Sequence, residues 1–192
     1  MRKVLIVVVG LAIGWAASAH ATTLVSNLGN AANGNLSPQN NFWMAQKFTT
    51  GASPFDLAFV QFRGARNAAQ SVAVLLFSHN GGSDLPASLL ATLDGSGITT
   101  TLGTQTVASP ASIHLAATTS YWIVLAPSTI DTALWTQTTD LTSTGTGSLP
   151  NRVAFSSTSG SSWVALSAGN NLLLLVDVGP LTPVELLEFA VD

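Results

Sequence analysis

Short apolar segments, each ended by turn-forming residues at intervals of about ten residues, constrain this chain more than any other feature. In Leu57–Arg63, for example, Ala58, Val60 and Phe62 share one face of a strand, while Gln61 and Arg63 point to the other. Alternation of this kind has the period of a half-buried β-strand, and no segment beyond residue 21 shows a long 3.6-residue apolar period. The pattern therefore favours a fold made of strands.

Eleven segments have this character: Thr22–Ser26, Trp43–Thr49, Leu57–Arg63, Val72–Ser78, Ser88–Leu93, Thr104–Ala108, Ser120–Leu125, Leu134–Thr138, Arg152–Ser156, Ser162–Ala165 and Leu172–Val178. Their number and spacing predict an all-β antiparallel β-sandwich or jelly roll of about 9–11 strands over residues 22–178. Three of them, Val72–Phe77, Tyr121–Leu125 and Leu172–Val176, are apolar on both faces. Either other parts of the chain cover their outer faces, or an apolar surface is left for a partner.

The N-terminus has the pattern of an export signal. Arg2 and Lys3 precede an uncharged apolar run of about 14 residues, and Ala19-His20-Ala21 offers the small residues that signal peptidase requires. A retained membrane anchor is the alternative, but this run is shorter than the roughly 20 residues that span a bilayer. We expect residues 1–21 to be a signal peptide that is cleaved after Ala21, which makes the protein secreted or attached to the cell surface.

Cleavage changes the charge balance. It removes two of the six basic residues and none of the nine acidic ones, so the formal charge changes from −3 to 4 − 9 = −5. Only 8% of the residues are charged, which leaves hydroxyl and amide groups to form most of the surface. Such a surface lacks the basic footprint of a nucleic-acid-binding protein, and no later segment is long enough to span a membrane.

Two segments stand apart from the strand pattern. Asn27–Asn41 is rich in asparagine and glycine and is expected to be a long surface loop. Residues 179–192 follow a Gly179-Pro180 break and form either a last edge strand or an appended tail.

One ordered series of motifs resembles a known family. Its parts are Trp43-Met44-Ala45-Gln46-Lys47-Phe48-Thr49-Thr50-Gly51, Leu75-Leu76-Phe77-Ser78-His79-Asn80-Gly81-Gly82, Pro86-Ala87-Ser88-Leu89-Leu90-Ala91-Thr92-Leu93, Thr119-Ser120-Tyr121-Trp122-Ile123-Val124-Leu125, Leu134-Trp135 and Phe155-Ser156-Ser157-Thr158-Ser159-Gly160-Ser161-Ser162-Trp163. The series resembles the bacterial choice-of-anchor domains, and the type R group most. The resemblance implies an exported β-sandwich with no catalytic residues to transfer. The PEP-CTERM sorting tail that often follows such domains is not evident, although Thr182–Phe189 is similar to a short Pro-Val-Glu-Leu stretch near the ends of some exported bacterial proteins.

The sequence offers no catalytic signature. It has no cysteine, no G-x-S-x-G elbow, no nucleotide-binding glycine loop and no pair of histidines at zinc-binding spacing. His79 and His114 are expected on a turn and beside a strand, and Asp56, Asp84, Asp94, Asp131 and Asp140 in or near turns. We therefore expect a protein that is not an enzyme and that needs no cofactor.

Two weaker binding signals remain. The loop oxygens of Asn80, Ser83 and Asp84 are of the kind that bind calcium, although the D-x-[DN]-x-[DN]-G pattern is absent. Trp135 and Trp163 either pack in the core or present a face on which a sugar ring could stack, whereas Trp122 is expected in the core.

Three functions follow as hypotheses. The first is a non-enzymatic structural or adhesion module, associated with extracellular matrix, exopolysaccharide, matrix proteins or other copies of itself. The second is a carbohydrate-binding module that uses exposed Trp135 or Trp163. The third and most remote is a small secreted hydrolase.

Overall fold

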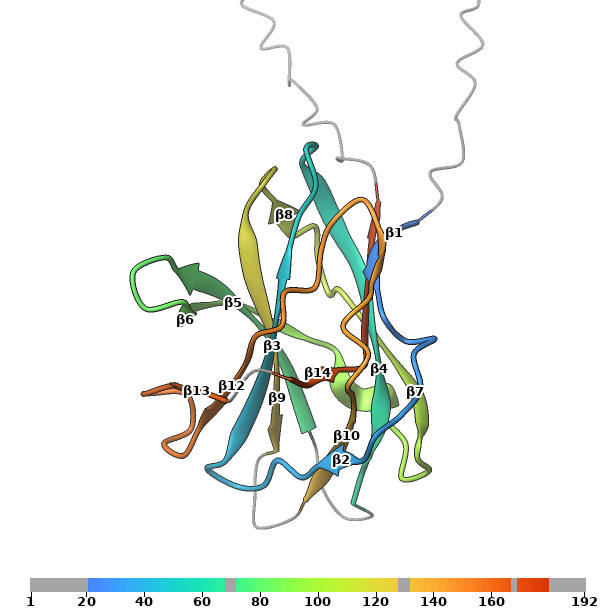
Figure 1. Cartoon of the computed structure of the whole chain (residues 1–192), viewed down its shortest axis with the longest axis vertical. Helices are drawn as coiled ribbons and strands as arrows, with labels where there is room; N and C mark the ends of the chain where they lie inside the picture. Colours follow the sequence, from blue (N-terminus) through green and yellow to red (C-terminus); the bar gives the residue numbers. More distant parts are fainter. Residues whose placement is uncertain (1–20, 68–71, 128–131, 167–168, 180–192) are drawn as a thin grey trace, which may run out of the picture.

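The structure, a computed structural model, describes residues 21–67, 72–127, 132–166 and 169–179. Within them the chain forms two antiparallel sheets and one 3₁₀ turn, η1 (Gly95–Gly97), and no α-helix. Figure 1 shows the two sheets packed against each other. The predicted all-β sandwich is confirmed. The predicted signal peptide at 1–21 lies, apart from Ala21, outside the described residues, and so does the predicted tail beyond Gly179.

The first sheet follows the order β11-β1-β15-β4-β10-β14, with β2 paired to β10 and with β7 and β8 paired to β4. Its strands are β1 (Thr22–Ser26), β2 (Asn35–Leu36), β4 (Phe55–Arg66), β7 (Gly103–Ala108), β8 (His114–Leu115), β10 (Ala133–Thr138), β11 (Thr144–Gly145), β14 (Asn171–Leu172) and β15 (Leu174–Gly179).

The second sheet follows the order β13-β12-β3-β9-β5-β6. Its strands are β3 (Trp43–Thr49), β5 (Val72–Asn80), β6 (Leu85–Leu93), β9 (Ser120–Pro127), β12 (Val153–Ser156) and β13 (Val164–Ala165). In Figure 1 the β5–β6 and β12–β13 hairpins extend toward the same side of the molecule.

The strands differ from the sequence prediction at particular places. Five two-residue strands raise the number of strands above the expected range, and one of them, β2, lies inside the predicted loop Asn27–Asn41. The predicted strand Leu172–Val178 is divided at Leu173 into β14 and β15, which pair with different neighbours. Short runs of this kind form only because a longer neighbouring strand presents free backbone groups to them.

The main core lies between the sheets and contains the inward side chains of both, including Phe48, Val60, Ile123 and Trp135. A second cluster lies on the opposite face of the second sheet, where Leu75, Phe77 and Trp122 are almost fully buried. The chain therefore covers the two-sided apolar strands β5 and β9 itself. This second cluster lies beside the polar groups described next.

Candidate functional site

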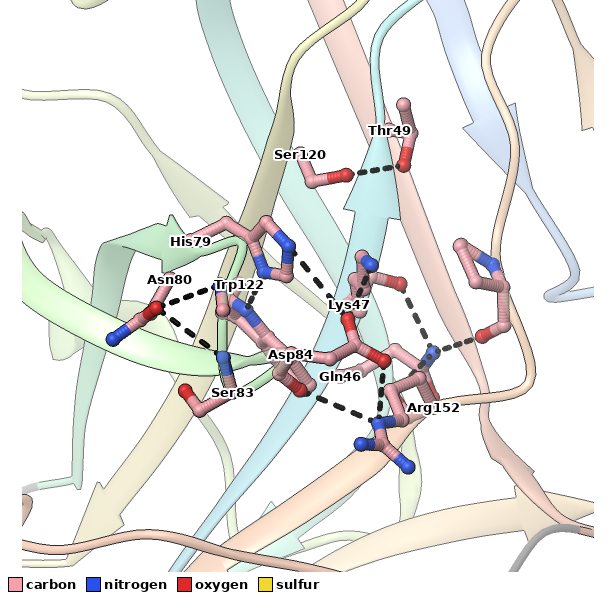
Figure 2. A network of polar contacts seen from close by, with 12 residues as sticks. Gln46, Lys47, Thr49, His79, Asn80, Ser83, Asp84, Ser120, Trp122 and Arg152 are labelled. Atoms are coloured by element: carbon pink, nitrogen blue, oxygen red, sulfur yellow. Dashed lines mark hydrogen bonds and ion pairs between the residues drawn. The ribbon is translucent and has the colours of Figure 1, made fainter.

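A compact ionic cluster lies on the outer face of the second sheet, at the turn of the β5–β6 hairpin (Figure 2). Asp84 is at its centre. The Lys47 Nζ on β3 lies 2.6 Å from the Asp84 Oδ1, and the Arg152 Nε, just before β12, lies 2.8 Å from the Asp84 Oδ2. The His79 Nε2 lies 3.6 Å from the same Oδ1. The cluster thus joins β3 and the residue before β12 to the β5–β6 hairpin of the same sheet.

The local backbone explains why Asp84 reaches these partners. The Asn80 Oδ1 accepts hydrogen bonds from the backbone N–H groups of Gly82 and Ser83, which closes the turn between β5 and β6. The Asp84 N–H donates to the Asn80 carbonyl at 2.8 Å, and Asp84 itself has a φ of 55°. Aspartate tolerates this left-handed conformation better than most residues. The turn therefore directs the carboxylate back across the sheet.

The charges shift the protonation equilibria of the two central groups. Partial burial alone would raise the pKa of Asp84, but the hydrogen bond and charge of Lys47, together with Arg152 and His79, outweigh it and hold the pKa below its usual value. Burial lowers the pKa of His79, and the charges of Lys47 and Arg152 lower it further against the opposing effect of Asp84. Asp84 is therefore ionised and His79 neutral at pH 7.

A tryptophan fixes the orientation of this histidine. The Trp122 Nε1–H on β9 donates to the His79 Nδ1 at 3.2 Å (Figure 2). An indole N–H is only a donor, so the Nδ1 must be the unprotonated nitrogen and the Nε2 carries the proton toward Asp84. The apolar cluster and the ionic cluster are joined through this pair.

The expected calcium ligands do lie in one turn, but their oxygens are used differently. The Asn80 Oδ1 accepts two backbone hydrogen bonds, and the Asp84 carboxylate faces two cationic side chains. A calcium ion needs six to eight oxygen ligands and would compete with those cations. Among the described residues, no three His, Asp or Glu side chains gather closely enough to hold a metal ion. The arrangement suits a structural ion-pair cluster better than a calcium site.

Of the two alternatives given for Trp135, the structure shows packing in the core and not a face open to a sugar. Trp135 is only 1% exposed, its ring lies 5.7 Å from that of Phe62, and its Nε1–H donates to the Leu173 carbonyl at 3.0 Å. It belongs to the core because its position on β10 faces the second sheet. The expectation that Trp122 lies in the core is confirmed, since Trp122 is 0% exposed.

Trp163, the other expected sugar platform, is half-buried. Its ring meets the ring of Phe77 edge-on, with the centroids 5.8 Å apart. Its Nε1 is buried, and no hydrogen-bond partner for it lies in the described part of the chain. Because it packs against the outer apolar cluster, Trp163 presents a smaller free surface than a stacking platform needs.

Three further aspartates of the described residues have local roles. The Asp94 Oδ1 accepts from the Ser96 N–H and the Asp140 Oδ1 from the Thr142 N–H, which confirms the expected turns. Asp56 lies between Ser112, whose hydroxyl donates to it at 2.5 Å, and His114, 3.6 Å away. A serine hydrolase instead places histidine between serine and aspartate. Asp131 lies outside the described residues.

A cavity of about 290 Å³ is lined by residues of β2, β10, β12 and β14. Its lining residues are Leu36, Gln137, Val153, Leu166, Asn170 and Leu172. None of them is ionisable, so this cavity offers no acid or base for catalysis.

Sequence reasoning missed the partners of Asp84. Lys47 lies 37 residues away and Arg152 lies 68 residues away, so only the strand order brings the three together. A signal was present in β3, where Lys47 is the one charged residue of an otherwise uncharged strand. A lone lysine between buried positions indicates a paired charge, but it does not identify the partner.

Comparisons with known proteins assign no family: no family model matches the chain, and no curated protein matches it. The resemblance to choice-of-anchor domains stays a prediction from the sequence. In the described ranges, no helix has the length and apolar character that crossing a membrane requires.

Proposed function

We propose that this protein is an exported, non-enzymatic module that works at the cell surface or in the extracellular matrix, through adhesion to polysaccharide, to matrix proteins or to copies of itself. The choice-of-anchor resemblance is part of this proposal, because such domains are exported β-sandwiches. A signal peptide at residues 1–21 would deliver the protein to that place.

One observation carries the proposal: four of the five aspartates of the described chain make contacts within it. Asp84 is held by two cations, Asp94 and Asp140 close turns, and Asp56 contacts a serine and a histidine. Asp177, the fifth described aspartate, is buried on β15. Because only 8% of all residues are charged, hydroxyl and amide groups make up most of the polar side chains, which suits uncharged partners and polymers.

The test uses protein secreted by an expressing bacterium. Mass spectrometry of the secreted chain should give a product that begins at Thr22. Sedimentation with bacterial cells, pull-down on immobilised exopolysaccharide and light scattering should then show association with at least one of these or with itself. A strictly monomeric protein that binds neither cells nor exopolysaccharide would overturn the proposal, whatever its route of export.

The other two functions have less support from the geometry. The hypothesis of a carbohydrate-binding module that uses exposed tryptophans is weakened because Trp135 is buried in the core. The hydrolase hypothesis is weakened because Asp56 lies between Ser112 and His114, in the position that a catalytic histidine would occupy.

A further inference from the structure

A shallow hollow of about 340 Å³ lies where the chain enters β3. Its lining residues are Gln39, Asn40, Asn41, Phe42 and Ser157. The first four form the turn before β3, and Ser157 begins the loop between β12 and β13. In Figure 1 these two segments lie close together at the lower left, and hydrogen bonds between Asn41 and Ser159 join them.

The first wall of the hollow is a tight turn. The Gln39 N–H donates to the Phe42 carbonyl at 2.9 Å, and the Phe42 N–H donates to the Gln39 carbonyl at 2.6 Å. Asn40 takes a φ of 41°, a conformation that asparagine tolerates well. Asn40 and Asn41 therefore stand at the tip of a two-residue hairpin, where both are exposed.

The second wall is fixed to the first by side chains of both segments. The Ser159 N–H donates to the Asn41 carbonyl at 3.1 Å, and the Ser159 hydroxyl donates to the Asn41 Oδ1 at 2.9 Å. The Trp43 Nε1–H donates to the Asn40 carbonyl at 3.1 Å, while its ring lies so close to Gly160 that a Cβ there would be 2.6 Å from the ring carbon Cζ3. Trp43 thus supports both walls, and the hollow exists before any ligand arrives.

The hollow is lined by three side-chain amides. In the part of the chain that the structure describes, the side-chain amides of Gln39 and Asn40 make no hydrogen bond, and Asn41 uses only its Oδ1. Each amide offers two N–H donors and a carbonyl acceptor at fixed spacing, which matches neighbouring hydroxyl groups. The half-buried Phe42 ring, stacked on Phe155 at 5.1 Å, supplies an apolar surface between them.

Charge and size narrow the ligand class. The lining contains no ionisable side chain, so nothing there compensates the charge of a phosphate, sulfate or uronate group. Its volume lies at the lower end of the range for small-molecule sites, which is about 300–1,000 Å³. Amides around an aromatic ring recognise a ligand that has hydroxyls on its edge and C–H groups on its face.

We propose that this hollow binds one or two neutral sugar units of a polysaccharide. The inference rests on the proposed adhesion function and adds the place and the ligand class. The sugar hydroxyls are bound by the amides of Gln39, Asn40 and Asn41, and Phe42 contacts the apolar face of the sugar ring. Trp43 positions both walls of the hollow. Neither Trp135 nor Trp163 takes part.

Neutral and acidic oligosaccharides titrated into the secreted, ¹⁵N-labelled protein test this inference. The probes are malto-, cello-, manno- and chito-oligosaccharides of two to six units, with oligogalacturonate as the charged comparison. The expected result is a saturable shift of the Asn and Gln side-chain amide signals with at least one neutral oligosaccharide and none with oligogalacturonate. Nuclear magnetic resonance detects binding at millimolar Kd, so weak single-site recognition is measurable.

Variants locate the site. Asn40→Gly, which keeps the left-handed backbone, and Gln39→Ala remove exposed amides, and each should weaken binding of the neutral oligosaccharide by about tenfold. Asn33→Ala removes an exposed asparagine amide outside the lining and should leave Kd unchanged. Unfolding midpoints equal to that of the parent protein show that the variants fold. The inference is overturned if no neutral oligosaccharide binds, if oligogalacturonate binds equally well, or if Asn33→Ala has the same effect as the other two.

The same variants separate this inference from the proposed function. If the Gln39→Ala, Asn40→Gly double variant still sediments with cells or exopolysaccharide as the parent does, the hollow is not the adhesive site although the adhesion function stands. If the parent itself does not associate with any of these partners, the proposed function fails, whether or not a free oligosaccharide binds.

Discussion

Gln46 joins the two sheets through the core, and its replacement by methionine should destabilise the fold more than any exposed glutamine can. Gln46 is 0% exposed on β3, in the second sheet. Its Oε1 accepts the Leu172 N–H of the first sheet at 2.8 Å, and its Nε2 donates to the carbonyls of Lys47, Pro150 and Arg152. Methionine has a similar volume, so Gln46→Met removes these hydrogen bonds while leaving little cavity.

The magnitude follows from which groups lose their only partner. The carbonyls of Pro150 and Arg152 keep backbone donors, the N–H groups of Arg152 and Lys47. The Leu172 N–H is left buried without a partner, which costs about 1–3 kcal/mol. Loss of the Nε2 hydrogen bonds adds about 1 kcal/mol. We therefore expect a loss of about 2–4 kcal/mol in the free energy of unfolding.

Urea unfolding, followed by tryptophan fluorescence, measures this loss. With an m value of about 2 kcal/mol/M, the midpoint should fall by about 1–2 M at unchanged m. Gln61→Met is the matched control, because the Gln61 Nε2 bonds only the exposed Thr106 hydroxyl, and it should change the stability by less than about 0.5 kcal/mol. Equal midpoints for the two variants would refute the argument that the Gln46 amide stabilises the fold by bonding the Leu172 N–H beside the break between β14 and β15.

Three further predictions concern the turns and the charges. Gly160 has a φ of 82° against the Trp43 ring, so Gly160→Ala should cost about 1–3 kcal/mol in thermal or urea unfolding, whereas Gly81→Ala, which meets nothing within 4 Å, should cost far less. The pKa of His79 is lower in the folded protein than the unfolded value of about 6.5, so the free energy of unfolding should be at its full value above that pH and fall as the pH drops below it. His79→Gln should flatten this decline between pH 7.5 and 5.5, and a slope equal to that of the parent protein would contradict the prediction. Because the described chain holds few charges and the ion pairs of Asp84 with Lys47 and Arg152 are partly exposed, raising NaCl from about 0.01 to 0.5 M should shift the urea midpoint only slightly. A large shift would show that charge pairs stabilise the fold.

The strands could be predicted from the sequence wherever alternation and turn residues coincided. The bounds of Thr22–Ser26 and Trp43–Thr49 agree fully with the structure, because each has a polar or Asn/Gly-rich segment at its end. The division at Leu173 could not be predicted. It depends on Gln46 and on Asn27, whose side chain bonds both the Leu172 carbonyl and the Leu174 N–H from about 145 residues away. Local patterns contain no information about such distant partners.

The candidate sites show the same division. The turn that holds Asn80 and Asp84 could be predicted from the sequence. The ion-pair partners of Asp84 could not, because only the strand order brings Lys47 and Arg152 to it. Trp135 followed the strand pattern, yet which face of β10 is buried depends on its register with Gly64 of β4. A slip of one residue would have turned the indole outward.

Amide side chains, rather than charges, connect distant parts of this chain. Inside, Gln46 and Asn27 join segments that no disulfide can join, since the chain has no cysteine. The Gln105 amide likewise bonds the Gly64 carbonyl and the Thr99 N–H. A neutral amide can donate and accept together, and its burial costs far less than that of an ion. In the interior these amides find backbone partners, whereas those of Gln39 and Asn40 face solvent without any in the described chain. The same chemistry that satisfies the backbone inside is therefore available to a hydroxyl-rich ligand at the surface.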